Sequence, residues 1–351
     1  MNHTVSGAPQ EKSELPLVSI IIPMRNEARH VRKCLESLVG QDYPISKYEV
    51  LVVDAMSDDG SRKLVTEYAN RFSYIRLLDN PREITPVAKN IGIKNARGEV
   101  IIILSAHSSV TPEFISQNVN ILERTDADCV GGPIKTIGEG YVGKGIALAL
   151  SSPFGVGNSR FRYARKAQYV DTVAFGAYRR GVFERIGLFD EELIRNQDND
   201  LHSRLKRTGG KIFLSPAIRS YYYARSSLGD LWKQAFKTGK WNIFTLRRSS
   251  GSLSIRHFIP LLFVLSLFTS LILSSLTRWG WVFLSLILLS YFLSALAFST
   301  RVSVRAGLQY LPILPVIFFS YHLSYGLGSV WGLVQFGLPF ARRTTGRFGW
   351  S

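Results

Sequence analysis

VSIIIP (residues 18–23) is a short, β-branched run closed by a proline. Such a run predicts a strand that is buried on both faces of a sheet. Similar runs occupy residues 48–54, 74–78 and 100–104. Helical patterns separate these runs over residues 31–38, 61–71 and 84–96. Because strands that alternate with helices pair in parallel and bind ligands at their carboxyl ends, the sequence predicts an α/β fold with a mostly parallel sheet.

Beyond residue 110 the pattern is less regular. Residues 128–137 and 172–178 predict two further strands. Residues 189–208 predict an acidic turn and then a helix that begins near Asp200. Residues 228–246 set leucine and tryptophan side chains against lysines, which is typical of a helix on an anionic membrane surface. A plain surface helix is the alternative.

Three long apolar stretches follow, over residues 258–276, 279–298 and 308–338. Each of the first two has about the 20 residues needed to cross a bilayer core, and neither contains a charged residue. The third is interrupted by prolines and glycines, which predicts a kinked or re-entrant segment. We therefore expect a transmembrane region at residues 256–341, after an amphipathic interfacial segment at residues 228–255.

The charge is divided unevenly along the 351 residues. The chain has 43 Lys and Arg against 26 Asp and Glu, but the last acidic residue is Asp230 and twelve basic residues follow it. The first 230 residues are therefore near neutral, which argues against a uniformly basic nucleic-acid-binding protein, and no nucleic acid is expected as a partner. The two cysteines, Cys34 and Cys129, are too few for a disulfide framework or a zinc site.

The N-terminal segment and the arginines near the apolar stretches predict how the chain is oriented in the membrane. Residues 1–16 read as a flexible lead-in without the apolar core of a secretion signal, so the folded domain is expected on the cytosolic side of the plasma (inner) membrane. Arg301 and Arg305 then lie in a cytosolic loop, and the basic tail at residues 342–351 favours the same side. This favours a re-entrant last segment and an even number of crossings, while three plain spans remain an alternative.

Polar clusters follow the first two predicted strands. After the first strand, Asn26 and Glu27 can hydrogen-bond a nucleoside at the edge of the sheet, although a helix N-cap is the alternative for Asn26. The second strand runs into DAMSDDGS (residues 54–61), whose carboxylates and hydroxyls suit a base, a ribose or a metal-bound phosphate. Helix capping explains the later residues of this cluster but gives the strand-terminal Asp54 no structural role.

These clusters together resemble glycosyltransferase family 2 and its GT-A (Rossmann-like) fold. The resemblance rests on VSIIIPMRNE (18–27), VVDAMSDDGS (52–61), AKNIGIKNARGEVIIIL (88–104) and FGAYRRGVFERIGLFDEELIRNQDNDLHSRLKRTGGKI (175–212). SSPFGVGNSRFR (151–162) narrows the resemblance to membrane-anchored bacterial exopolysaccharide glucosyltransferases of the succinoglycan type. With the apolar stretches it covers nearly the whole chain and implies a GT-A nucleotide-sugar domain at residues 17–227.

The resemblance implies a donor pocket for a UDP-sugar at the carboxyl ends of the strands. Its expected residues are Pro23, Asn26, Glu27, Asp54, Lys89, Asn90 and Ser105. The family commonly carries Asp-x-Asp or Asp-x-His after the fourth strand, where these side chains hold Mg²⁺ or Mn²⁺ against the diphosphate. Here Ser105 replaces the first carboxylate, for which a hydroxyl is a poor substitute, while His107 can still ligate the metal.

The resemblance places the catalytic base at Asp198, within NQDND (196–200). An inverting transfer is a single displacement, so one carboxylate must take the proton of the acceptor hydroxyl. Gln197 stands where relatives have a carboxylate, and helix capping is a further role for Asp198. The other implied acceptor-site residues are Gly176, Ala177, Asp200 and Arg204. The Gln-x-x-Arg-Trp box of processive relatives is absent from the sequence.

The sequence thus predicts an inverting hexosyltransferase that moves a sugar, with glucose favoured, from a UDP-sugar to a hydroxyl of a polyprenyl-diphosphate-linked saccharide in surface polysaccharide biosynthesis. The expected partners are the UDP-sugar, the lipid-linked acceptor, the lipid bilayer and other polysaccharide-assembly proteins. Two alternatives stay open. One is a polyprenyl-phosphate sugar synthase. The other is a non-catalytic scaffold of an assembly complex, which the replacements at Ser105 and Gln197 suggest.

Overall fold

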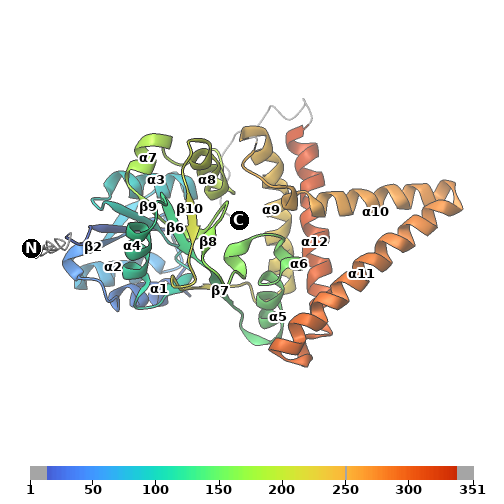
Figure 1. The fold of residues 1–351 in the computed structure, drawn as a ribbon, viewed down its shortest axis with the longest axis horizontal. Coiled ribbons are helices and arrows are strands. Elements are labelled where there is room, and N and C mark those ends of the chain that lie inside the picture. Colours follow the sequence, from blue (N-terminus) through green and yellow to red (C-terminus); the bar gives the residue numbers. More distant parts are fainter. Residues whose placement is uncertain (1–13, 250, 338–351) are drawn as a thin grey trace, which may run out of the picture.

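The computed structural model describes residues 14–249 and 251–337, and shows an α/β domain beside a group of C-terminal helices (Figure 1). Most of the predicted flexible lead-in and all of the predicted basic tail lie outside these residues. The large sheet has the order β3 (Ile75–Asp79), β2 (Tyr48–Asp54), β1 (Val18–Met24), β4 (Val100–Ile103), β9 (Ala174–Arg179), β6 (Cys129–Gly132), β10 (Ile212–Leu214), β8 (Gln168–Tyr169). A small sheet has the order β5 (Ser108–Val110), β11 (Ser220–Tyr223), β7 (Ile134–Ile137).

β1 lies inside the parallel half of the large sheet because its side chains are apolar on both faces. It pairs in parallel with β2 on one side and with β4 on the other. Ile20 and Ile22 enter the core on one face, Ile21 enters the core on the other, and all three are fully buried. The predicted α/β fold with a mostly parallel sheet is confirmed. The antiparallel exceptions are β9, which pairs with β4 and β6, and the edge strand β8.

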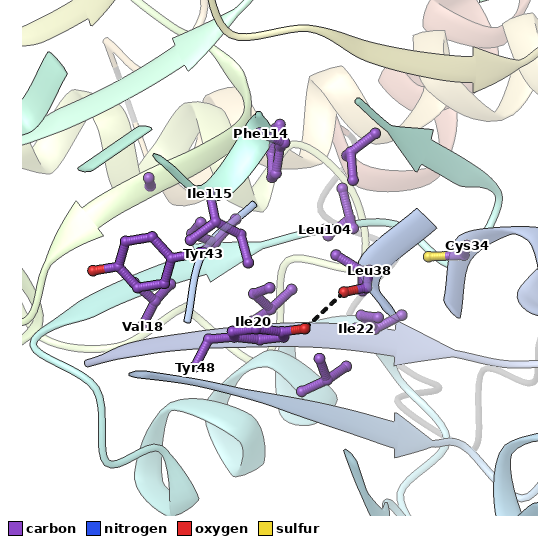
Figure 2. Close-up of a cluster of buried hydrophobic side chains, with 14 of the residues drawn as sticks. Val18, Ile20, Ile22, Cys34, Leu38, Tyr43, Tyr48, Leu104, Phe114 and Ile115 are labelled. Atoms are coloured by element: carbon purple, nitrogen blue, oxygen red, sulfur yellow. Dashed lines mark hydrogen bonds between the residues drawn. The ribbon is translucent and has the colours of Figure 1, made fainter. Parts of the chain in front are cut away.

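Helices cover both faces of the large sheet. α1 (Val31–Val39), α2 (Ser61–Arg71) and α4 (Phe114–Arg124) bury apolar side chains on the face of Ile20. α3 (Thr85–Asn95), α7 (Gly181–Ile186) and α8 (Gln197–Arg207) do so on the face of Ile21. Figure 2 shows the first cluster, in which the Tyr48 hydroxyl donates a 3.0 Å hydrogen bond to the Leu38 carbonyl. α8 begins at Gln197, three residues earlier than the sequence predicted.

The prediction of a single strand at residues 128–137 is wrong, because Pro133 divides it. β6 ends at Gly132 and β7 begins at Ile134. A proline has no N–H for a strand ladder, so the chain leaves the large sheet at this point and continues in the small one. The break directs the following chain away from the half of the sheet that contains β1 and β2, and toward the C-terminal helices.

That chain forms α5 (Gly140–Leu150), an apolar helix that the sequence analysis did not predict. Its Ile146 and Leu150 belong to one buried cluster with Leu314 and Ile317 of α12 (Ile313–Gly332). Figure 1 shows α5 and α6 (Pro153–Val156) beside α12. The α/β domain and the C-terminal helices therefore share an apolar core.

Within the described residues, three helices are long and apolar enough to cross a membrane. They are α10 (Ile259–Leu276), α11 (Arg278–Ala306) and α12 with its continuation to Gly337. Figure 1 shows α10 and α11 leaving the rest of the protein as a hairpin, whereas α12 runs beside α9 (Leu228–Arg248) and crosswise to α10. α12 is also less apolar and more buried within the protein than the other two helices.

Glycines allow α9 and α12 to pack closely. A Cβ atom added at Gly239 of α9 would lie 2.0 Å from the Tyr325 carbonyl oxygen, and one at Gly328 of α12 would lie 2.1 Å from the Phe236 carbonyl oxygen. The Ser324 hydroxyl also donates a 2.7 Å hydrogen bond to the Trp232 carbonyl. Small residues at such a contact bring two helix backbones together and are typical of helix pairs in membranes.

We predict that Gly328→Ala will destabilise the protein by roughly 1–3 kcal/mol, because the added methyl group must push α9 away from α12. Gly229→Ala is the matched control, since its nearest neighbour, the Ser227 hydroxyl, would lie 3.9 Å from the new Cβ. Thermal unfolding in detergent should show a loss for Gly328→Ala and none for Gly229→Ala. Equal behaviour of the two variants would contradict the close packing.

Candidate active site

The carboxyl ends of β1, β2 and β4 meet at one edge of the large sheet because the three strands are parallel. The chain then continues into Arg25–Glu27, Ala55–Gly60 and Leu104–His107. Pro23 lies in β1 opposite Val53 of β2, beyond the last β4 partner of β1, so its missing N–H breaks no bond to β4. The predicted donor residues of these loops are thus brought together.

Asp54 ends β2 with its side chain fully buried. Its carboxylate accepts a 2.5 Å hydrogen bond from the Ser57 hydroxyl and lies 3.2 Å from an Arg62 guanidinium nitrogen, which also pairs with Asp79. Ser57 and Arg62 line a shallow hollow together with Asp58. Asp54 therefore holds two residues that line this hollow. A nucleotide could bond to Asp54 directly only if Ser57 or Arg62 released its own bond to the carboxylate.

Hydrogen bonds join the loops after β1 and β2. The Asn26 backbone N–H donates to the Ser57 hydroxyl at 2.9 Å, and the Asn26 side-chain oxygen accepts from the Asp58 backbone N–H at 3.1 Å. Asn26 and Met56 both have φ in the left-handed region, at 51° and 56°. Backbone strain of this kind persists where surrounding contacts enforce it, which is common at functional sites.

Glu27, Ser105 and His107 form the next group along the edge. His107 Nδ1 lies 2.8 Å from Glu27 Oε1 and 3.1 Å from the Ser105 hydroxyl. Tyr222 of β11 places its ring 5.2 Å from the His107 ring. Glu27, His107, Tyr222 and Arg225 line one hollow. The predicted metal ligand His107 therefore lies beside a predicted donor residue in a cavity.

This group does not fit a metal ion held by the protein alone. Within residues 14–249 and 251–337, no three His, Cys, Asp or Glu side chains come together as a metal site. Glu27 and His107 bond to each other, and Ser105 supplies a hydroxyl where a carboxylate would favour the ion. Mg²⁺ or Mn²⁺ use thus stays a prediction, and no step below depends on it.

Lys89 and Asp198 form an ion pair of 2.6 Å, between Nζ of α3 and Oδ1 in the first turn of α8. The Lys89 side chain is 5% exposed and lies 4.6 Å from the centre of the Phe189 ring, whereas the Asp198 side chain is 52% exposed. Surrounding protein opposes ionisation of Asp198, but the Lys89 ammonium outweighs this effect and lowers the pKa of the carboxyl. Asp198 is thus an accessible, ionised carboxylate.

A buried network lies under this carboxylate, one helical turn along α8. His202 Nδ1 lies 2.8 Å from the Thr172 hydroxyl, and its Nε2 lies 2.8 Å from the Tyr178 hydroxyl. Burial lowers the pKa of His202 to about 4, so the imidazole is neutral at physiological pH. These bonds attach α8 to β9 and thereby fix the position of Asp198.

Three predicted site residues have their polar groups engaged inside the protein. The Asn90 amide donates to and accepts from the Phe189 backbone, at 2.9 and 3.0 Å. The buried Asp200 pairs with Arg204 at 2.9 Å, and Arg204 also donates to the backbone carbonyl of Leu188. These bonds favour structural roles, and contacts of the three side chains with donor or acceptor stay predictions.

Gly176 and Ala177 lie within β9, inside the segment 172–178 that the sequence predicts as a strand. Ala177 is fully buried and pairs with Ile102 and Val130 in the sheet. The preceding Phe175 has φ of 50°, which turns the chain as it enters this part of the strand. An acceptor therefore cannot meet the Ala177 side chain, and an acceptor contact at Gly176 would have to involve its backbone.

Residues 19–187 match the family model for glycosyl transferase family 2. The chain carries a glycosyltransferase family 2 domain. Over 91% of this chain and 97% of the relative, it is 29% identical to a dolichyl N-acetyl-α-D-glucosaminyl phosphate 3-β-D-2,3-diacetamido-2,3-dideoxy-β-D-glucuronosyltransferase of Methanococcus voltae. Over 69% of this chain and 74% of the relative, it is 27% identical to the succinoglycan biosynthesis protein ExoA of Rhizobium meliloti.

Solved glycosyltransferases share the fold at low sequence identity. The mannosyltransferase PcManGT of Pyrobaculum calidifontis, in complex with GDP-Man and Mn²⁺, aligns with a TM-score of 0.59 and 17% identity over 91% of this chain and 88% of that chain. Residues 1–349 of S. aureus TarS, in complex with UDP-GlcNAc, align with a TM-score of 0.52 and 16% identity over 92% of both chains. The predicted family resemblance and the GT-A fold are thus confirmed.

Sequence reasoning missed several residues of the glycosyltransferase site. It placed Lys89 near the nucleotide but did not foresee its pairing with Asp198, which is 109 positions away. It also assigned nothing to Arg195, His202 and Tyr222, because each gains its significance from a neighbour distant in sequence. The motif NQDND gave a signal for Asp198, and its two acidic residues, Asp198 and Asp200, both lie in the first turn of α8.

We predict that Lys89→Gln will move the acidic limb of the pH profile of kcat/KM to higher pH. Removing the ammonium removes the attraction that lowers the pKa of Asp198, so the carboxyl retains its proton at higher pH. Lys94→Gln, an exposed site on the same helix, is the control and should leave the profile in place. An unchanged limb in Lys89→Gln would show that Asp198 does not titrate as the base.

We also predict that His202 makes folding stability fall as the solution becomes acidic. Its pKa is about 4 in the folded protein against 6.5 in the unfolded chain, so between these values the unfolded chain binds a proton that the folded chain does not. Stability therefore decreases as pH falls through this window, by at most about 1.4 kcal/mol per pH unit for one group. Thermal unfolding at neutral and mildly acidic pH should show a smaller pH dependence in His202→Gln than in the wild type.

Proposed function

We propose that this protein transfers a hexose, with glucose favoured, from a UDP-sugar to a hydroxyl of a polyprenyl-linked saccharide, with inversion at the anomeric carbon. The observation that carries the proposal is the Lys89–Asp198 pair, which gives an ionised and accessible carboxylate. It belongs to a glycosyltransferase family 2 chain whose donor loops gather at the neighbouring strand ends.

The proposed reaction is a single displacement. The acceptor oxygen attacks the anomeric carbon, and the bond from that carbon to the phosphate oxygen breaks, so that UDP leaves with the electron pair. The Asp198 carboxylate takes the proton of the attacking hydroxyl. Lys89 keeps Asp198 ionised before the reaction, and the His202 network holds α8 in place.

The names of the relatives support a lipid-linked acceptor. The Methanococcus voltae relative, which this chain matches over 97% of its length, is named for a dolichyl-linked N-acetylglucosaminyl phosphate. The Rhizobium meliloti relative is named for succinoglycan biosynthesis. Both names describe the assembly of a glycan, and the first describes a saccharide on a phosphorylated polyprenol. We extend this acceptor class, with a diphosphate or a monophosphate link, to the present chain.

The proposed location is the plasma membrane, with the glycosyltransferase domain on the cytosolic side. α10 and α11 are the proposed crossings, and α12 is proposed to lie along the membrane surface with α9. The crosswise course of α12 in Figure 1 and its greater burial support this arrangement. It gives an even number of crossings, as the arginines at the end of α11 favour.

We predict that Asp198→Asn will lower kcat by about 10²–10⁴-fold while UDP binding stays unchanged, because the variant lacks a proton acceptor. Asp171→Asn, a surface carboxylate paired with Lys206, is the control and should keep full activity. The measurement is UDP release and sugar transfer by full-length protein in lipid, with a panel of UDP-sugars. A small effect of Asp198→Asn would favour the polyprenyl-phosphate sugar synthase, whose phosphate acceptor needs little help from a base.

The same panel tests the scaffold alternative and the metal. A wild-type protein that neither binds UDP nor releases it from any sugar donor would favour the scaffold. UDP binding should be measured by calorimetry with and without Mn²⁺. The predicted metal use requires tighter binding with Mn²⁺, with the diphosphate of the substrate completing an ion site beside His107. Equal affinity in both would show that Ser105 and the Glu27–His107 bond leave no place for the ion.

We predict that Thr277→Cys and Gly337→Cys will react with a membrane-impermeant maleimide from opposite sides of the membrane. Thr277 joins α10 to α11, and Gly337 ends the continuation of α12. The native Cys34 and Cys129 are buried and should give little background. Labelling of both new cysteines from the same side would contradict the proposed two crossings.

A further inference from the structure

Four basic side chains come from separate segments between the glycosyltransferase domain and the C-terminal helices. Arg162 ends the short helix η2 (Arg160–Arg162), Arg195 precedes α8, Arg225 follows β11 and Lys237 lies in α9. Arg195 interacts electrostatically with Arg225, and Lys237 with both. Arg162 and Arg195 each interact with Tyr321 of α12. We call Arg162, Arg195, Arg225 and Lys237 the basic cluster.

The basic cluster has no acidic partner in the described part of the chain. None of its members is within 4.0 Å of a carboxylate oxygen, the limit for an ion pair. By contrast, other arginines of the protein, such as Arg62, Arg204 and Arg248, pair with aspartates. A charge that is withdrawn from water is normally paired, so the cluster calls for an external anion.

Most hydrogen-bond donors of the cluster have no partner among the described residues. Arg195 donates to the Thr238 hydroxyl at 3.5 Å, and Arg162 donates to the Thr136 hydroxyl at 3.3 Å. The Arg162 guanidinium also lies 5.2 Å from the centre of the Tyr222 ring. Since a guanidinium has five N–H groups, both arginines retain donors for the oxygens of a phosphate.

The charges in the cluster oppose one another. Burial lowers the pKa of Arg195, and the neighbouring Arg225 lowers it further. Burial also lowers the pKa of Lys237, as do Arg195, Lys233 and Arg225. An anion bound among them would offset this repulsion. The repulsion raises the electrostatic free energy of the free protein, and binding of an anionic ligand lowers it.

The position of the cluster connects three parts of the site. Arg195 lies three residues before Asp198 and is the last residue before the N-cap of α8. Arg225 lines the hollow that contains Glu27 and His107. Tyr321 and Lys237 belong to α12 and α9, the helices proposed to lie at the membrane surface. A phosphate bound here would lie between the base and the membrane.

We propose that the basic cluster binds the phosphate of the lipid-linked acceptor and so presents the attached sugar to Asp198. This assignment rests on the proposed function. Three of the four charges come from the glycosyltransferase domain, and Arg162, Arg195 and Lys237 are half-buried, so they do not form the exposed basic face that attracts bilayer headgroups in general. The Arg195 bond to Thr238 of α9 and the place of Lys237 in α9 favour a lipid phosphate over the diphosphate of the donor.

The test uses full-length protein in nanodiscs of neutral phosphatidylcholine, titrated with farnesyl phosphate and with farnesol as the phosphate-free probe. Binding is followed by tryptophan fluorescence, and UDP binding is measured on the same preparations. The variants are Arg195→Gln and Lys237→Gln. Arg247→Gln, an exposed arginine on α9 with the same change of charge, is the control. Melting temperatures check folding, and removal of one repelling charge should not lower them.

We expect wild-type protein to bind farnesyl phosphate at least about tenfold more tightly than farnesol, and each cluster variant to lose at least about tenfold while Arg247→Gln and UDP binding are unchanged. Weaker UDP binding with intact farnesyl phosphate binding would assign the cluster to the donor and overturn the proposal. So would equal losses in Arg247→Gln, or farnesyl phosphate binding that requires added phosphatidylglycerol, because both indicate general headgroup attraction. If wild-type protein binds the phosphate but transfers no sugar, the site stands and the proposed function fails.

Discussion

The ion pair between Lys89 and Asp198 joins the two halves of the glycosyltransferase domain at the point where chemistry is proposed. Lys89 belongs to α3, which packs against β1 and β2, and Asp198 belongs to α8, which covers the same face of the sheet. Lys89 is nearly buried, so without Asp198 its charge would lack a partner, and without Lys89 the pKa of Asp198 would rise. Asp198 thus provides the partner for the charge of Lys89, and Lys89 keeps Asp198 ionised.

The sheet explains how these groups reach one edge. The parallel strands β1, β2 and β4 deliver the donor loops, and the antiparallel strand β9 brings in the chain that leads to α8. Positive φ at Asn26, Met56, Phe175 and Asn196 marks the turns where the chain enters the site. β9 and the His202 network then hold α8 rigidly, which is what a proton acceptor near an attacking oxygen requires.

The packing of α9 against α12 connects the glycosyltransferase domain with the C-terminal helices. Glycines at 239 and 328 bring the two helices into backbone contact, and α5 buries its apolar face on α12. The glycosyltransferase domain is therefore attached directly to α9 and α12, the helices proposed to lie at the membrane surface, rather than through a flexible tether. The basic cluster lies at this junction, where the head of a lipid-linked substrate would emerge.

Local sequence patterns predicted much of this structure. The features that depend on pairing between distant segments could not be predicted from such patterns. β-Branched runs identified β1 to β4, and apolar length identified α10 and α11, because these signals are contained in one segment. The split at Pro133 and the apolar helix α5 depend on which sheet or helix receives the chain. The basic cluster could not be predicted from the sequence, since its four residues come from four segments.

The most direct test of the central claim is the stereochemistry of transfer. The product formed from an α-linked UDP-sugar and a lipid-linked acceptor can be analysed by NMR of the new glycosidic linkage. A single displacement with Asp198 as base predicts a β linkage. An α linkage would mean retention, which a single displacement does not give, and would contradict the account.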